Sequence, residues 1–482
     1  MKKATILMAL VLLLSVGGVG VLAADVFEER DQVVLTEKVV YGDRSKADGL
    51  TVQLDSHYSR RLFWNTSMKL DEGLSTATEY VFSAKQIRED YPVEHRGIGL
   101  SNRVHGGVEF DLDNPQEGLW VAYKELYDET EPGQEKETDI LLKDYIDHYP
   151  MTIELDFPDA EYSAEAWKSF DGMEALPGSE IYAIQALRDY FKIPVLEDEH
   201  YQIHVRKREN GMQSGWGGGT SQYGDRYYMF DYSVLSDDAC YFTFSTTTDE
   251  GEVVDISELP DGYGIYRLPY QTEYNEQRKE NVSVIDVDNL EMVYPLEPGI
   301  ELSSLSMNKE QTCLYLHAVQ DGKYSITVID IASMKTLQKL DITDVEDDSW
   351  WSIWNQDDFM VIELSPAQEL VVMSIAENGE LQVEYTCPVL PEDFDGFSIY
   401  GVAMDFDGER LVCVRPLEIE EEYEGEYRDR TTCNLQVAVY EEEGLVYFGE
   451  YTNSLDTGEN WANHSFYVRV NDFNPVVATW TR

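Results

Sequence analysis

A repeat in the second half of the chain constrains its fold more than any other feature. Apolar, β-rich runs, each followed by a turn and a further apolar run, occur at 282–287, 326–331, 370–375 and 435–440. The first three are 44 residues apart, and the fourth comes 64 residues after the third when Ala438 is aligned with Ser374. We interpret the additional residues, the acidic stretch 418–430, as a loop inserted in the last copy. A period of this length is typical of a repeated unit of four short strands.

Further strand signals fill each 44-residue unit. In two successive units they occur at 302–307, 313–319, 325–331 and 336–340, and at 351–354, 359–364, 370–375 and 381–385. Turn residues such as Asp321 and Gly322 separate them. A single four-stranded sheet cannot cover both of its faces, whereas sheets stacked against one another can. The sequence therefore predicts an all-β chain of antiparallel sheets arranged around an axis.

Two of the repeated strands carry a family resemblance. Val284-Ile285-Asp286 and Val328-Ile329-Asp330 resemble the third strand of a blade in the β-propeller superfamily, in particular its exported repeat type. The resemblance covers about residues 230–482, and it implies a propeller of about seven or eight four-stranded blades. It implies no ligand site, because propellers of this shape differ in function from family to family.

The first half of the chain is less regular. Strands are predicted at 62–64, 80–82, 107–110, 119–123, 151–155, 201–205 and 227–232. One short helix is predicted from Ser179 to Phe191, where Ile181, Ile184 and Leu187 follow helical spacing. Residues 225–482 are thus expected to form regular blades, and residues 25–225 either irregular blades or a separate α+β domain.

The two ends of the chain are expected to meet. Strands predicted at 465–470 and 475–480 leave the last blade incomplete, and strands at 33–41 and 50–54 could supply what is missing. Such pairing would protect sheet edges that otherwise aggregate.

The N-terminus has the layout of an export signal. Lys2 and Lys3 precede an uncharged run over residues 4–24, and acidic residues follow it. This layout fits a cleaved secretory signal and a retained membrane anchor equally well. Either way the chain is predicted to be extracytoplasmic, secreted or anchored in the cell membrane by residues 4–24. It resembles exported cell-envelope proteins of Gram-positive bacteria in this layout and in its acidity, which implies an envelope role but no particular activity.

The charge of the chain restricts its partners. The 93 acidic residues outnumber the 36 basic ones, which gives a formal net charge of −57. A field of this sign repels phosphate backbones and anionic lipid heads, so we expect no nucleic acid and no membrane contact beyond the N-terminal segment. It favours a protein or peptide partner, cationic ones included, although the acidity also suffices to keep a monomer soluble.

Cysteine and histidine give no metal or redox motif. The five cysteines, at 240, 313, 387, 413 and 433, contain no CxxC pair and lie in β-rich runs. Buried single thiols are expected, and any one disulfide cannot be assigned from spacing. His200 and His204, with Glu197 and Glu199 nearby, make only a partial metal site, so we interpret them as surface histidines.

Three other motifs have structural interpretations. The sequences Asp-Phe-Asp-Gly at 393–396 and 405–408 lack the spacing of a calcium loop and predict tight turns. The glycine-rich segment 215–220 lacks the residues of a phosphate-binding loop and predicts a flexible loop. The basic cluster 206–208 is expected to pair with acids of the same chain.

These observations favour a binding protein over an enzyme. There is no Gly-x-Ser-x-Gly elbow, no carboxylate pair stands out among so many acids, and no catalytic, cofactor or metal residue is assigned. We expect a non-catalytic extracytoplasmic propeller that binds a protein or peptide partner at the cell envelope. The alternative is a carbohydrate-binding or carbohydrate-active propeller that uses paired carboxylates and tryptophans. The candidate binding residues are Trp350, Trp351, Trp354 and Trp216.

Overall fold

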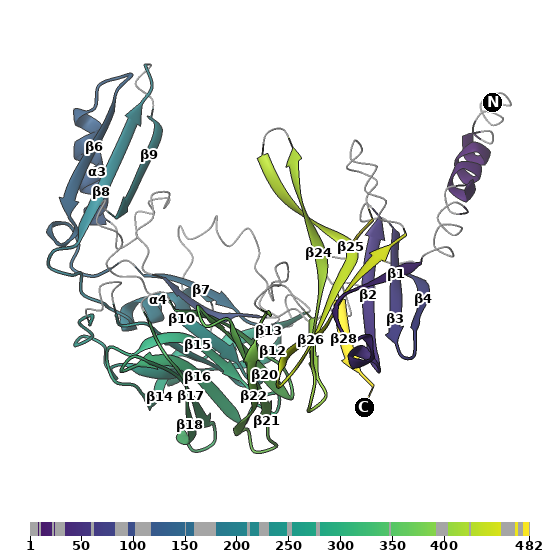
Figure 1. The fold of residues 1–482 in the computed structure, drawn as a ribbon. Helices are drawn as coiled ribbons and strands as arrows, with labels where there is room; N and C mark the ends of the chain where they lie inside the picture. The colour runs from purple at the N-terminus through teal and green to yellow at the C-terminus, as the bar shows by residue number, and fades with distance from the viewer. Residues whose placement is uncertain are drawn as a thin grey trace. The chain divides into compact units, whose positions relative to one another are not determined.

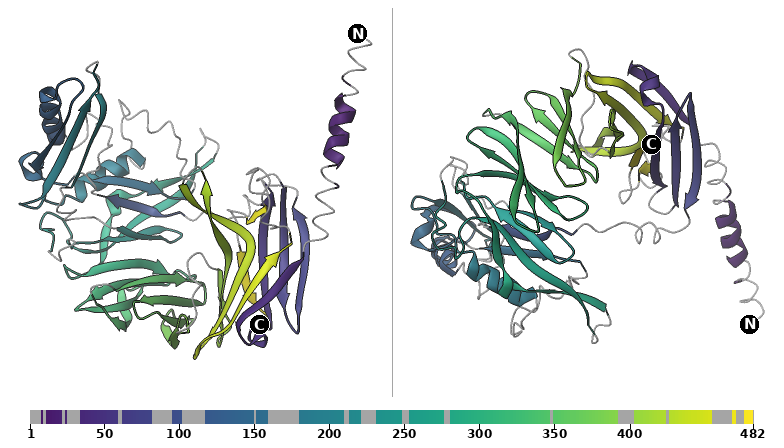
Figure 2. Two further views of the ribbon diagram at one scale, coloured as in Figure 1. Left: turned by 45° about the horizontal axis from the view of Figure 1, so that its top comes forward. Right: turned by 90° about the horizontal axis from the view of Figure 1, so that it is seen from below.

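The computed structural model of the 482-residue chain divides into two compact units. It describes residues 8, 11–21, 24, 34–58, 62–81, 95–101, 117–149, 151–158, 180–209, 213–220, 231–247, 253–275, 280–346, 349–391, 403–423, 426–454, 468–470 and 476–481. The terminal unit contains Met1–Val93, Asp348–Ala376 and Gln382–Arg482, and the central unit contains Glu94–Asp347 and Glu377–Leu381. Most described elements are strands of separate antiparallel sheets (Figures 1 and 2).

One sheet of the central unit is a four-stranded meander, as predicted. Its strands, in order across the sheet, are β15 (Glu301–Met307), β16 (Cys313–Gln320), β17 (Lys323–Asp330) and β18 (Lys335–Asp344). Asp321 and Gly322 connect β16 to β17 with φ angles of 54° and 73°. Two left-handed residues in a two-residue hairpin give the turn whose twist matches that of the strands.

The neighbouring copy of the repeat was assigned to the wrong strand position. Its sheet contains β10 (Asp231–Leu235), β11 (Ala239–Phe244), β12 (Gly264–Asn275), β13 (Glu280–Ile285) and β14 (Glu291–Pro295). Both β13 and β14 pair with β12, so residues 282–287 contribute to an interrupted outer strand and β12 is the third strand. The apolar alternation marks a half-buried strand followed by a turn, and it does not specify where in the sheet that strand lies.

The other described residues of the central unit form two smaller sheets and two helices. The sheets are β5 (Gly97–Ser101) with β7 (Thr152–Asp156), and β6 (Glu135–Leu141) with β8 (His200–Lys207) and β9 (Gln213–Thr220). The helices are α3 (Glu117–Glu129) and α4 (Glu180–Tyr190), with 3-10 turns at Leu142–Asp144 and, between β13 and β14, η4 (Val287–Asn289). The predicted helix is confirmed as α4, and strands are confirmed at β7 and β8.

Two predictions in this region are wrong. Residues 119–123 were expected to form a strand and instead belong to α3, in which Ala122, Tyr123 and Leu126 are buried. That burial follows helical spacing, which a short apolar run alone does not reveal. Residues 215–220 were expected to form a flexible loop and instead belong to β9, because a glycine-rich segment can still pair its backbone with β8. The strand predicted at 107–110 lies outside the described residues.

The described residues of the terminal unit form three sheets. A four-stranded meander, again as predicted, consists of β19 (Trp350–Asn355), β20 (Phe359–Ser365), β21 (Glu369–Ile375) and β22 (Leu381–Pro388). A second sheet has the order β1 (Leu35–Gly42), β26 (Gly444–Asn453), β25 (Glu426–Glu441), β24 (Leu411–Tyr423) and β23 (Ala403–Phe406). The third contains β27 (Val468–Val470), β28 (Val476–Trp480), β2 (Leu50–Tyr58), β3 (Leu62–Leu70) and β4 (Leu74–Val81).

The acidic stretch 418–430 is a hairpin, not the loop that was predicted. Strands β24 and β25 continue past a bulge at Pro416 and pair from Glu418 with Thr431 as far as Tyr423 with Glu426 (Figure 1). The inserted residues therefore lengthen the second and third strands of this sheet. High charge did not prevent pairing, because backbone hydrogen bonds within a hairpin do not require apolar side chains.

Strands from the two ends of the chain pair, as predicted. Strand β2 pairs with both β27 and β28, and β1 pairs with β26. The N-terminal strands thus join two different sheets, whereas the sequence suggested that they complete one. Residues 11–21 are helical. Within the described part of the chain, no helix combines the length and the apolar character needed to cross a bilayer.

The turn at 405–408 joins the chain ends. Asp407 Oδ1 accepts the backbone N–H groups of Glu409 and Arg410 at 3.0 and 2.7 Å, which confirms the predicted tight turn. The Arg410 guanidinium donates to Asp407 Oδ2 and to the carbonyls of Lys46 and Asp48, at 2.8 to 3.1 Å, and lies 4.0 Å from the ring centroid of Trp480. One side chain therefore holds segments from both termini. The similar sequence at 393–396 lies outside the described residues.

A buried polar cluster holds β1 against β26. Tyr447 and Tyr451 both donate to Glu37 Oε1 at 2.9 Å, and Arg44 Nε lies 2.5 Å from the same oxygen. A Cβ atom at position 449 would lie 2.1 Å from the Tyr447 hydroxyl oxygen, so only glycine leaves room for this hydroxyl. The cluster fixes the N-terminal edge strand in register.

We predict that Arg410→Ala destabilises the terminal unit. It leaves the Lys46 and Asp48 carbonyls and the Asp407 carboxylate without their donor, which should lower the free energy of unfolding by about 2–4 kcal/mol. Urea denaturation followed by tryptophan fluorescence measures the loss. Lys38→Ala is the control, since Lys38 forms an exposed 2.8 Å ion pair with Glu450 and should contribute less than about 1 kcal/mol. Equal losses for the two variants would contradict the proposed importance of Arg410.

We also predict acid destabilisation through His317. This side chain is fully buried, its Nδ1 lies 2.8 Å from the Tyr324 hydroxyl, and burial lowers its pKa from 6.5 to about 3. Below about pH 6.5 the His317 ring is therefore protonated in the unfolded chain but stays neutral in the folded one. The free energy of unfolding should fall by up to about 1.4 kcal/mol per pH unit between pH 6.5 and pH 3.

Urea midpoints measured from pH 7 to pH 4 test this contribution. His317→Gln, which keeps a polar side chain without a titrating ring, should show a shallower loss of stability than the original chain over this interval. Identical slopes for the two proteins would contradict the assignment.

Candidate functional site

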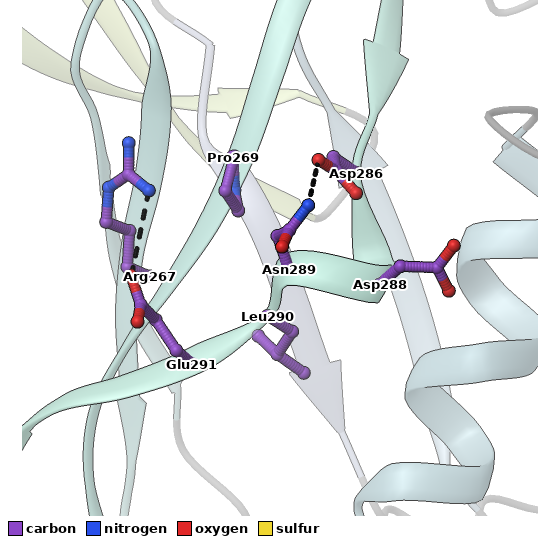
Figure 3. A pocket seen from close by; sticks show the side chains of 7 residues that line it. All are labelled: Arg267, Pro269, Asp286, Asp288, Asn289, Leu290 and Glu291. Carbon is purple, nitrogen blue, oxygen red and sulfur yellow. Dashed lines mark hydrogen bonds and ion pairs between the residues drawn. The ribbon is translucent and has the colours of Figure 1, made fainter.

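An open acidic depression lies in the central unit, where the outer strand β13–β14 is interrupted. Its volume is about 430 Å³, and its lining residues are Arg267, Pro269, Asp286, Asp288, Asn289, Leu290 and Glu291 (Figure 3). All of them come from β12, from the connection between β13 and β14, or from the first residue of β14. The depression is therefore a local feature of one sheet.

The break in strand pairing creates the depression. Tyr270 on β12 pairs with Ile285, but the next paired residue, Arg267, faces Glu291. Residues 286–290 therefore oppose only two residues of β12, and they bend outward into the 3-10 turn η4. Pro269 lies at this point of β12 and has no N–H to donate to a continuous ladder. Its carbonyl instead accepts the N–H of Asp286 at 2.9 Å, which fixes the start of the turn.

Carboxylates dominate the lining. The lining contains three acids, Asp286, Asp288 and Glu291, and a single cation, Arg267. The Arg267 guanidinium makes its shorter ion pair with an acid outside the lining, since its Nη2 lies 2.9 Å from Asp238 Oδ2. Its distance to the lining acid Glu291 is longer, at 3.8 Å from Nη1 to Oε1. Burial lowers the pKa of Arg267, but hydrogen bonding to Tyr241 and the charge of Asp238 outweigh it and leave the pKa raised. The arginine thus remains charged and does not neutralise all three acids.

The acids are held in place by neighbouring polar groups. Asn289 Nδ2 donates to Asp286 Oδ2 at 2.7 Å, and the hydroxyl of Tyr182 on α4 donates to Asp288 Oδ1 at 3.3 Å. Asp288 points away from Arg267, toward that helix (Figure 3). The negative charge of Asp288 raises the pKa of Tyr182 in turn.

The lining combines acidic, basic, amide and apolar side chains. It contains no histidine, cysteine, serine or aromatic side chain, so it offers no nucleophile with an adjacent base and no ring on which a sugar could stack. Among the residues that the structure describes, no group of three or more His, Cys, Asp or Glu side chains is arranged to hold a metal ion.

The four predicted tryptophans lie elsewhere. Trp350, Trp351 and Trp354 are on β19 in the terminal unit, where Trp350 and Trp354 share one face and Trp351 lies on the other. Trp216 is on β9 in the central unit, and its side chain is outside the described part. The structure thus brings Trp350 and Trp354 to one strand face, and none of the three tryptophans whose side chains are described lines the depression.

The two histidines considered as metal ligands each pair with a different acid. His200 Nδ1 lies 3.0 Å from Asp139 Oδ2, and His204 Nε2 lies 2.7 Å from Glu135 Oε1. Both acids come from β6, not from the nearby Glu197 and Glu199. In the basic cluster, Arg206 pairs with Glu135 at 3.8 Å and Lys207 lies 3.8 Å from the ring centroid of Tyr127, in agreement with internal pairing.

Reasoning from sequence missed the acidic depression. Asp286, Asp288 and Asn289 were interpreted as a strand end and its turn, which they are, but their relation to Arg267 depends on the register of β12. The available signal was Pro269 in the middle of a strand otherwise rich in apolar residues, because an internal proline marks a break in pairing.

Comparison with known proteins adds no assignment. No family model and no curated protein matches the chain. Among solved structures, a 6-phosphogluconolactonase-like protein of Bacteroides fragilis is 10% identical, with a TM-score of 0.28, over 85% of this chain and 100% of that one. The Cps50 β-propeller domain of Myceliophteria thermophila is 9% identical, with a TM-score of 0.20, over 53% and 93%. TolB of Acinetobacter baumannii is 11% identical, with a TM-score of 0.19, over 62% and 88%.

Proposed function

We propose that this chain is a non-catalytic, extracytoplasmic binding protein that takes a positively charged segment of a protein or peptide partner into the acidic depression. The observation that supports this most directly is that three acids, Asp286, Asp288 and Glu291, share the lining with one arginine that is itself engaged by Asp238. A cationic side chain entering there would meet uncompensated carboxylates at positions already fixed by hydrogen bonds. Binding to hydrogen-bond acceptors that are already held in position loses less conformational entropy than binding to mobile ones.

The apolar part of the lining fits the same ligand. Pro269 and Leu290 lie between the acids. Lysine and arginine carry a charged group on a chain of methylene groups, which favours apolar contact along its length. A depression with acids around two apolar residues would accommodate both parts of such a side chain.

We further propose that the sheets form a propeller of about seven or eight blades. Two observations support this arrangement: successive four-stranded meanders follow the 44-residue period, and strands from the two ends of the chain pair. The N-terminal layout supports export, with residues 4–24 either removed as a signal or retained as an anchor. A partner at the cell envelope would then be accessible to the binding surface.

A carbohydrate ligand is the second candidate. The observation that favours it is Trp350, which is 43% exposed at the start of β19. Exposed tryptophan faces suit sugar rings, but a sugar would also need a suitably placed pair of carboxylates for hydrolysis. This candidate therefore concerns β19 and not the acidic depression.

The binding proposal predicts a charge-specific loss at the depression. Asp288→Asn and Glu291→Gln should each weaken binding of a lysine-rich decapeptide about twofold to fivefold, and the double variant about tenfold, because each removes one partly solvated ion pair. Isothermal titration at low and physiological salt measures this, and affinity should fall as screening increases.

A matched control separates the depression from the overall charge of the chain. Glu297→Gln removes one charge from an exposed position outside the lining and should leave binding nearly unchanged. A decapeptide with glutamine in place of lysine should not bind measurably. If Glu297→Gln weakens binding as much as Asp288→Asn, the attraction comes from net charge alone and the depression is not the site.

A further inference from the structure

One face of β19 combines two tryptophans with a carboxylate from β20. Trp350, Ser352 and Trp354 alternate along this face, and the register places Ser352 directly opposite Glu363. Trp350 and Trp354 are opposite Ser365 and Val361, respectively. Alternate residues of a strand are about 6.7 Å apart, so the Cα atoms of Trp350 and Trp354, with Ser352 between them, are about 13 Å apart. Glu363 therefore lies between the tryptophan positions, on the neighbouring strand.

Glu363 is a carboxylate whose charge is poorly compensated. It is half-buried, and burial raises its pKa. Its Oε2 is buried without a hydrogen-bond partner. An ionised oxygen that loses water and gains no donor costs free energy, so such groups in proteins usually have a partner or a ligand.

A second polar group without a partner lies in the same surroundings. The hydroxyl of Tyr440 on β25 is buried and has no hydrogen-bond partner, and the side chain is fully buried. Burial raises the pKa of Tyr440, and the charge of Glu363 is one of several smaller contributions in the same direction. Trp354 packs against the apolar cluster that contains Tyr440. The nearby cation Arg415 directs its Nε to Gln436 Oε1, at 2.8 Å.

We propose that Trp350, Trp354 and Glu363 bind the guanidinium group of an arginine side chain presented by a partner protein. The indole faces attract a cation, the buried Glu363 oxygen accepts an N–H donor, and a planar guanidinium satisfies both at once. A quaternary ammonium has no N–H for Glu363. A neutral sugar can donate hydrogen bonds but does not offset the carboxylate charge. This inference concerns the terminal unit and does not rest on the acidic depression.

Titration of the full chain with small ligands tests the proposal. The probes are N-acetyl-arginine amide, its neutral citrulline analogue, choline and methyl glucoside. We expect saturable binding of the arginine compound by isothermal titration calorimetry and binding at least about tenfold weaker for citrulline, which has the same shape without the charge. Equal binding of arginine and citrulline, or no arginine binding at millimolar concentrations, would overturn the proposal. Choline or methyl glucoside binding more tightly than arginine would also overturn it.

Variants locate the binding on this face. Glu363→Gln should weaken arginine binding about tenfold, and Trp350→Leu about threefold, because they remove the charged acceptor and one aromatic face. Glu369→Gln is the control: Glu369 is exposed on β21 opposite Leu364, on the other face of the sheet, and its loss should change nothing. Unchanged binding in Glu363→Gln would overturn the proposal.

Two further measurements keep the test decisive. Near-ultraviolet circular dichroism checks folding, and if Glu363→Gln is misfolded, the exposed Trp350→Leu substitution carries the test instead. Asp288→Asn, in the acidic depression, should leave binding of the small arginine compound at this face intact. The proposal for the acidic depression and the proposal for this face of β19 can therefore be contradicted independently, the first by the decapeptide experiment and the second by the arginine titration.

Discussion

The fold depends on covering both faces of its central strands. In β11 and β16 nearly every residue is buried, including neighbours whose side chains point to opposite sides of the sheet. A four-stranded sheet with such strands cannot exist alone in water, because each face must be covered by another layer. Stacking of sheet against sheet or helix follows from this requirement. Outer strands such as β14 and β18 are only partly buried, which leaves them available for recognition.

The same requirement explains the polar ties at the chain ends. Strand β1 pairs with β26, and β2 pairs with β27 and β28, all of which come from beyond residue 400, so these pairings close long loops of chain. Closing such loops costs conformational entropy, and local contacts must offset it. Arg410, which bonds to Asp407 and to two N-terminal carbonyls, and Glu37, which accepts two tyrosine hydroxyls, provide directional contacts at these junctions. These ties specify the register of strands that apolar burial alone would define less sharply.

Much of the sheet structure could be predicted from the sequence. The strands of both complete meanders and helix α4 follow from periodicity, because burial on one side of an element leaves a pattern of 2 or 3.6 residues. The failures have two causes. Residues 282–287 were correctly predicted as a strand, but whether that strand lies third or fourth in its sheet depends on segments distant in sequence. Residues 119–123 and 418–430 were assigned to the wrong kind of element, because neither a short apolar run nor a high density of charge decides between helix, strand and loop.

The candidate sites illustrate the same limit. Trp350 and Trp354 could be placed on one face by alternation, whereas Glu363 joins them only through the register between β19 and β20. The acidic depression forms because five residues, 286–290, lie opposite only two residues of β12, and composition does not reveal this mismatch. Functional groups brought together by register are therefore the part of this protein that sequence reasoning alone predicts least well.

The five buried thiols have a consequence for how the chain can mature. All five cysteines are free and buried, and burial raises the pKa of Cys240 and Cys387 to about 12. A thiol that stays protonated is a poor nucleophile toward oxidants and disulfides. Once folded, the chain would keep the same covalent structure on either side of a membrane, whatever the redox potential there. Its maturation would then depend on how fast the sheets close over these sulfur atoms, and not on an enzyme that reshuffles disulfides.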